Sequence, residues 1–84
     1  MIHLGISMRK REVKLKKKVV KSLAKLPRGI RDRLALLVEH LRQKGVNPGA
    51  IWNNFSKLEK NKYHCHLTRS YVACWEDKGE TIQL

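Results

Sequence analysis

The sequence is poor in acidic residues and has no long apolar run. Only 7 Asp and Glu residues stand against 19 Lys and Arg, which gives a formal net charge of +12. No run approaches the ~20 apolar residues that a membrane-spanning helix needs, so we expect no membrane association of that kind. The N-terminus, MIHLGISM, is too short for a secretory signal and lacks the basic segment that precedes one. We therefore expect a cytoplasmic protein.

Cysteine is also scarce, because the chain has only Cys65 and Cys74. Without a sign of export, both are expected to be free thiols in a reducing compartment. Neither a Cys-x-x-Cys nor a His-x-x-x-His spacing is present, so no such pattern supplies the ligands of a zinc site. We expect neither a metal ion nor a cofactor.

Positive charge, in contrast, is abundant and unevenly distributed. Twelve Lys and Arg residues fall between Arg9 and Arg33, against only Glu12 and Asp32. Self-repulsion at this charge costs stability, and a polyanion usually balances it: a nucleic acid, an acidic protein or an anionic membrane surface. A chain of 84 residues also buries a small core, which favours binding to a partner or forming a homodimer.

Hydrophobic periodicity predicts that a strand and two helices come first. Residues 11–15 (REVKL) alternate polar and apolar side chains, which is typical of a strand. Residues 16–26 and 29–44 repeat apolar side chains at three- and four-residue spacing, which is typical of amphipathic helices. Pro27 separates them, so the two helices are expected to form an antiparallel hairpin.

The second half of the chain predicts strands. A polar connection over residues 52–61 comes first, with apolar side chains expected to tuck under the helices at Trp52, Phe55 and Leu58. Three consecutive strands are then expected over residues 63–68, 71–76 and 80–84. The resulting order is β-α-α-β-β-β, an α+β fold in which an antiparallel sheet packs against the helical hairpin.

The first eight residues allow two interpretations within this single domain of residues 1–84. The alternation of Ile2, Leu4 and Ile6 favours an extension of the first strand. Alternatively, Met8 is the biological start, and the preceding residues are an N-terminal extension.

The stretch KYHCHLTRSYVACW, residues 62–75, holds both cysteines and two of the four histidines. Alternate residues of a strand share a face. One face would carry Tyr63, Cys65 and Leu67, and the other would carry His64, His66 and Thr68. The apolar set is expected to face the helices, because a one-residue slip would bury both histidines. His64 and His66 should therefore project from the open face of the sheet.

Three interpretations of these histidines are open. They could be two ligands of a zinc site that lacks the others, or simply solvated surface residues. They could also face bound RNA, because imidazole can take a proton from a ribose 2′-hydroxyl or give one to a leaving oxygen. Neighbouring cations would then hold phosphates and stabilise charge at phosphorus, namely Lys57, Lys60, Lys62 and Arg69. Aromatic residues could stack a base, for example Tyr71 or Trp75.

Two segments taken together resemble the RelE/ParE toxin superfamily of bacterial toxin–antitoxin modules. They are LKKKVVKSLAKLPRGIRDRLALLVEHLRQKG, residues 15–45, and SKLEKNKYHCHLTRSYVACWED, residues 56–77. The resemblance covers roughly residues 9–84 and implies an antiparallel sheet curved around two helices. RelE-like members cut ribosome-bound mRNA by attack of a 2′-hydroxyl on the adjacent phosphate, whereas ParE-like members inhibit DNA gyrase. Both are held inactive by an antitoxin, often through an acidic segment that wraps the toxin.

The resemblance implies roles for particular residues. His64 and His66 occupy positions where RelE-like enzymes place basic residues, and Tyr71 matches an aromatic residue that opens the third strand. Val72 departs from the pattern, since many members have a phosphate-binding arginine there, and Arg69 could substitute from the turn. We expect His64, His66 and Arg69 to be catalytic. The residues expected to bind RNA are Lys57, Lys60, Lys62, Tyr71, Lys16, Lys17 and Lys18, although a charge run at a helix start is often only a solvated face.

The leading hypothesis is a RelE-like, ribosome-dependent mRNA endonuclease with a cognate acidic antitoxin as its partner. RelE-like chains continue beyond the position of Leu84 with further cleavage residues, so we expect a truncated chain or a reduced site. Loss of a general acid or base typically costs about 10²–10⁴-fold in rate. The alternative is a non-enzymatic gyrase inhibitor or an inactive toxin remnant. A third is an unrelated basic domain that binds nucleic acid through residues 9–33.

Overall fold

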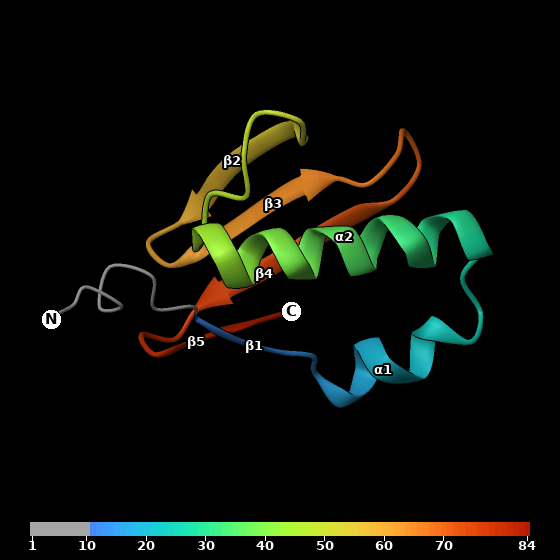
Figure 1. Ribbon diagram of the computed structural model, residues 1–84, viewed down its shortest axis with the longest axis horizontal. Coiled ribbons are helices and arrows are strands. Elements are labelled where there is room, and N and C mark those ends of the chain that lie inside the picture. Colours follow the sequence, from blue (N-terminus) through green and yellow to red (C-terminus); the bar gives the residue numbers. More distant parts are fainter. Residues whose placement is uncertain (1–10) are drawn as a thin grey trace, which may run out of the picture.

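The computed structural model describes residues 11–84, which fold into two helices and five strands (Figure 1). Along the chain these are β1 (Glu12–Lys14), α1 (Lys17–Leu23), α2 (Arg28–Lys44), β2 (Asn53–Glu59), β3 (Lys62–His66), β4 (Val72–Asp77) and β5 (Thr81–Gln83). The expected α+β class is confirmed. The two interpretations of the N-terminal eight residues lie outside the described residues.

All five strands belong to one sheet with the order β1-β5-β4-β3-β2. The strands from β2 to β5 pair antiparallel with their neighbours in the chain. The first strand pairs with the last in parallel, with Val13 opposite Ile82. Parallel strands need a crossover connection between them. The connection from β1 to β5 includes both helices. The sheet is therefore mostly antiparallel, with one parallel edge strand.

A strand replaces the polar connection expected at residues 52–61. β2 carries almost only exposed side chains, so it shows no alternation of buried and exposed positions, and its backbone pairing with β3 is what makes it a strand. Phe55 is its one half-buried side chain, and Trp52, just before it, is 3% exposed. Leu58 does not tuck under the helices, because it is 53% exposed.

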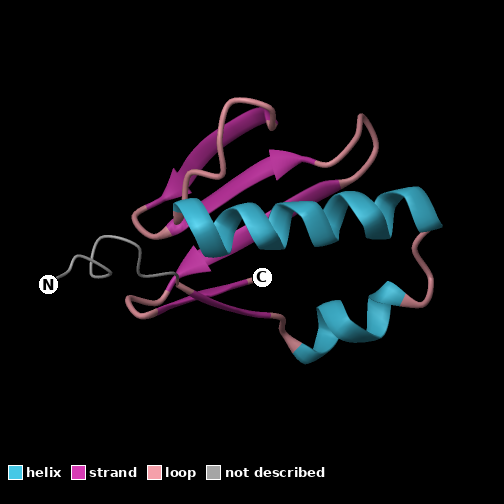
Figure 2. Cartoon of the chain, in the orientation of Figure 1, coloured by secondary structure: helices cyan, strands magenta, loops and turns pink. Residues whose placement is uncertain are grey.

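The core joins residues of α2 with residues of the sheet, and Figure 2 shows α2 in front of the sheet. Four apolar residues on one stripe of α2 are buried: Ile30, Leu34, Leu37 and Leu41. The helix ends at Gly45, which has a positive φ of 87°, and its N–H donates to the Leu41 carbonyl. α1 has no fully buried residue and lies beside α2 rather than over the middle of the sheet.

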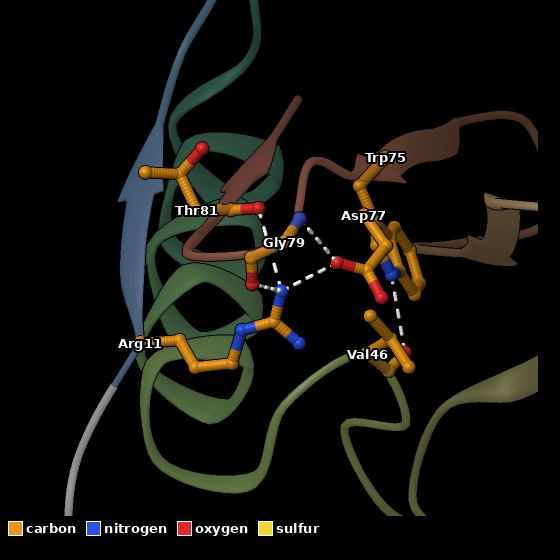
Figure 3. A network of polar contacts seen from close by, with 6 residues as sticks. All are labelled: Arg11, Val46, Trp75, Asp77, Gly79 and Thr81. Atoms are coloured by element: carbon orange, nitrogen blue, oxygen red, sulfur yellow. Dashed lines mark hydrogen bonds and ion pairs between the residues drawn. The ribbon is translucent and has the colours of Figure 1, made fainter.

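Arg11 ties the start of β1 to the turn between β4 and β5 (Figure 3). Its Nη2 donates to Asp77 Oδ1 at 2.5 Å and to the Gly79 carbonyl at 2.5 Å. Asp77 Oδ1 also accepts the backbone N–H of Gly79 at 2.9 Å. The Gly79 N–H, followed by the Arg11 guanidinium, holds the pKa of Asp77 below its ordinary value.

We expect Asp77→Asn to lower the free energy of unfolding by about 1 kcal/mol at pH 7, since the charge-assisted bonds to Arg11 are partly exposed. The folded-state pKa of Asp77 is depressed, so its stabilisation is present above the unfolded pKa and is lost as pH falls through the folded one. Urea unfolding at pH 7 and at about pH 2.5 should show the difference shrinking at low pH. Glu80→Gln, an exposed change on the same turn, is the control. If Asp77→Asn lost the same free energy of unfolding at both pH values, the lowered pKa of Asp77 would be contradicted.

Candidate functional site

The pairing of β3 with β4 separates two faces of the sheet. Cys65 is fully buried and Leu67 is 6% exposed, so this set of side chains faces α2 as expected. His64 lies opposite Cys74, and His66 lies opposite Val72. These four side chains project from the face of the sheet away from α2, which is called the open face below. The predicted direction of both histidines is confirmed.

The two histidines lie next to each other on the open face. Their ring centroids are 6.0 Å apart and their planes are tilted by 56°. His64 Nδ1 is 3.1 Å from Ser56 Oγ, a hydrogen bond across the β2–β3 pair. This bond orients the His64 ring and leaves its Nε2 for another partner. Two groups able to give or take a proton are thus held at a distance that a phosphodiester can bridge.

A hollow of about 390 Å³ brings His66 and Arg69 together. Its other lining residues are Asn53, Asn54 and Thr68. Asn54 has a positive φ of 57°, and the register of β2 against β3 shifts between Asn53 and Ser56. This irregularity lies at the end of the β2–β3 pair where the two asparagines line the hollow with His66. A cation, an imidazole and two amides suit a phosphate and a base edge.

A second hollow of about 250 Å³ lies towards the other end of the sheet. Lys16 and Lys62 line it together, although they are far apart in the sequence. Glu76 lines it as well and also forms an ion pair with Lys78 at 3.5 Å. Cys74 lines the hollow too, opposite His64, so the second hollow begins next to the histidines.

The structure does not bring the remaining predicted residues to the histidines. Lys57 lies opposite Tyr63, on the α2 side of the sheet, with its Nζ 5.9 Å from the centre of the tyrosine ring. Tyr71 lines a cavity between the helices and β4. Lys60 is exposed in the β2–β3 turn, and residues 17–18 are exposed at the start of α1.

Sequence reasoning missed four residues of the open face: Asn53, Asn54, Ser56 and Cys74. The first three were assigned to a connection, because β2 lacks the apolar alternation of a strand. The pair of asparagines was the available signal, since Asn is the residue that most readily adopts a positive φ after glycine. Cys74 could have been placed by continuing the strand alternation from Trp75.

The two thiols differ in environment. Burial raises the pKa of Cys65 to about 11. Arg33 lowers this pKa by a smaller amount, and Cys74 adds a small increase. Cys74 is exposed on the open face, and both cysteines are free. Within residues 11–84, no cluster of three or more His, Cys, Asp or Glu residues could hold a metal ion. In the same part of the chain, no helix is both long and apolar enough to cross a bilayer.

No protein-family model and no curated protein sequence matches this chain. Its structure is similar to a chain in the crystal structure of the archaeal RelE–RelB complex from Pyrococcus horikoshii OT3. The TM-score is 0.68, the sequence identity is 22%, and the match covers 88% of each chain. The chain has a RelE-like fold. The resemblance seen in the sequence is thereby confirmed at the level of fold, and the arrangement of the open face can be considered on that scaffold.

We expect a thiol reagent such as iodoacetamide to modify Cys74 of the native protein and to spare Cys65. The reason is that Cys74 is exposed, whereas burial both shields Cys65 and keeps its thiol protonated. Peptide mass mapping after brief labelling at pH 8 should find one modified cysteine, and two after unfolding in urea. Rapid native labelling of Cys65 would contradict the assigned faces of β3.

Proposed function

We propose that this chain is the toxin of a type II toxin–antitoxin pair, and that it cleaves mRNA on the ribosome. The observation that carries the proposal is the grouping of His64, His66 and Arg69 on the open face of a RelE-like fold. The net charge of +12 supports a nucleic-acid target. Action on ribosomes would place the protein in the cytoplasm.

In the proposed reaction, His66 takes the proton of a ribose 2′-hydroxyl, and the 2′-oxygen attacks the adjacent phosphorus. The bond from phosphorus to the 5′-oxygen of the next nucleotide breaks, leaving a 2′,3′-cyclic phosphate. His64, oriented by Ser56, gives a proton to the leaving 5′-oxygen. Arg69, in the same hollow as His66, stabilises the charge that develops on the phosphoryl oxygens.

The second hollow provides a path for the RNA backbone away from the cleavage point. Lys16 and Lys62 both line it and would each neutralise a phosphate. Three further exposed lysines, close in sequence to Lys16 or Lys62, would contact the ribosomal RNA backbone: Lys17, Lys18 and Lys60. Lys57 and Tyr71, which lie away from the histidines, are left out of this contact surface.

The proposed partner is an antitoxin with an acidic segment. The neighbour of similar fold was solved as a RelE–RelB complex. A chain with 19 basic and 7 acidic residues gains stability when an acidic polypeptide reduces its self-repulsion.

A second candidate function is inhibitory binding without cleavage, by a gyrase inhibitor of the ParE type or by an inactive toxin remnant. Val72 favours it, because an exposed aliphatic side chain lies opposite His66, where an arginine would help to hold a phosphate. Inhibition of gyrase supercoiling without any effect on translation would distinguish this function.

Replacing His66 or Arg69 by alanine should lower the rate of mRNA cleavage by about 10²–10⁴-fold, the usual cost of losing a proton-transfer or charge-stabilising group. Programmed ribosomes are incubated with each variant, and mRNA ends are mapped by primer extension. Arg31→Ala, an exposed change of the same kind on α2, is the matched control and should cleave normally. Cleavage that survives the His64→Ala/His66→Ala double change would remove both histidines from the mechanism.

Lys16→Ala and Lys62→Ala should weaken ribosome binding while leaving the single-turnover rate at saturation nearly unchanged, because these residues hold backbone rather than reacting atoms. Each change should also reduce the slope of log affinity against log salt by about one. Lys44→Ala, an exposed change at the end of α2 that lines neither hollow, is the control. An unchanged salt slope for both variants would place the RNA elsewhere.

A further inference from the structure

The hollow that holds His66 and Arg69 lies at one end of the β2–β3 pair. Asn53, the first residue of β2, lies opposite His66, the last residue of β3. Figure 1 shows both of these strand ends at the same end of the sheet. Just beyond them come Trp52, before β2, and Leu67, after β3, which are 3% and 6% exposed. This end of the pair therefore has the hollow on its open face and two buried side chains on its α2 face.

Arg33, from the second turn of α2, contacts both of those buried residues. Its Nε donates to the Leu67 carbonyl at 3.2 Å, which gives a main-chain acceptor of a buried residue its partner. Its Cζ lies 4.9 Å from the centroid of the Trp52 ring, within the range of a cation–π contact. One half-buried side chain of α2 thus joins the segment before β2 to the segment after β3.

Trp52 is held at its edge as well as at its face. Its indole N–H donates to His40 Nδ1 at 2.9 Å. The two rings are inclined at 78°, with their centroids 5.7 Å apart. Because an indole nitrogen can only donate, His40 Nδ1 must be unprotonated in this bond. Arg33 and His40, both on α2, therefore fix the position and the orientation of the indole.

Three lining residues of the hollow are sequence neighbours of these two buried side chains. Asn53 follows Trp52 in the chain, and it lines the hollow. His66 and Thr68 lie on either side of Leu67, and both line the hollow as well. Neighbouring residues of an extended chain point to opposite faces. Holding the two buried side chains on the α2 face therefore holds the backbone that presents their neighbours to the hollow.

We propose that Arg33 is a positioning residue for this hollow. Through Trp52 it holds the start of β2, and through Leu67 it holds the end of β3, so one guanidinium sets the spacing between the two sides of the hollow. Asn54 adds to this dependence, because its φ is 57° and a non-glycine residue keeps such a conformation only where the surrounding structure holds it. The inference rests on the proposed function only for naming mRNA as the molecule that the hollow acts on.

A lysine could not make both contacts of Arg33 at once. The planar guanidinium lies over a ring while its Nε–H donates in its own plane, whereas the lysine ammonium is a point charge on a flexible stem. Arg33→Lys keeps the charge and one contact at a time, and Arg33→Met keeps an unbranched stem and neither contact. Comparison of the two variants separates the effect of the charge from the effect of the geometry.

The first test follows amide hydrogen exchange by NMR on the full chain, without ribosomes. The N–H of Leu67 donates to the Tyr71 carbonyl. Because antiparallel ladders alternate, His64 and His66 direct their backbone groups to β2 instead. In Arg33→Met the His66 amide should exchange about 10-fold faster, because local opening of this end loses a hydrogen bond and a cation–π contact. The His64 amide, further along the same pair, is the internal control and should keep its rate.

The second test is mRNA cleavage on programmed ribosomes. Arg33→Met should lower the single-turnover rate at saturating ribosomes by about 10–100-fold, because small displacements of positioned groups are costly. Its affinity for the ribosome should stay unchanged, since the guanidinium contacts no RNA. Arg33→Lys should restore part of the rate. Asp77→Asn, which destabilises the opposite end of β4, is the stability control and should cleave normally.

Equal acceleration of the His64 and His66 amides would overturn the proposal, because it would show only a general loss of stability. So would an unchanged single-turnover rate in Arg33→Met, or a loss that Asp77→Asn matches. If Arg33→Met fails to fold, Arg33→Lys replaces it and must show a smaller acceleration at the same amide; an unchanged rate of exchange would overturn the proposal. If the unaltered chain cuts no mRNA, the nuclease proposal fails, whereas the exchange measurement still decides the role of Arg33.

Discussion

The pairing of β3 with β4 in one register is the constraint on which the rest of the structure depends. Trp75 fixes that register: it is 2% exposed, and its indole N–H donates to the Val46 carbonyl at 3.1 Å. Its ring lies nearly parallel to those of Phe55 and Tyr63, at centroid distances of 6.1 and 6.4 Å. A slip of one residue would expose these aromatic rings and bury the histidines. The same strand register therefore determines both the core and the candidate site.

The parts of the fold that were predictable are those in which burial leaves a period in the sequence. α2 has four buried residues on one stripe, and in β3 the buried Cys65 stands between two partly exposed histidines, so both were recognised. β2 was missed because its stability comes from backbone pairing and from Phe55 alone, which leaves no such period. The parallel partnership of β1 with β5 also has no local signal, since it joins the two ends of the described chain.

The candidate site also has features that the sequence predicts and features that it does not. Strand alternation was enough to put His64 and His66 on the open face. The proximity of Arg69 and His66 depends on the path of the turn after β3, and the approach of Asn53 and Asn54 depends on a bulge. Lys57 was grouped with the histidines by its distance along the sequence, yet pairing with Tyr63 turns it to the other face. These three arrangements could not be predicted from residue spacing, because each depends on how distant segments of the backbone are placed.

The parallel contact between the first and last strands has a consequence for the order of events during synthesis. Val13 cannot meet Ile82 until almost the whole described chain has been made, and the Arg11–Asp77 ion pair has the same dependence. Contacts between residues so distant in sequence form slowly, because the loop-closure entropy must be overcome first. During synthesis, the sheet therefore stays without its β1 edge strand until β5 has been made.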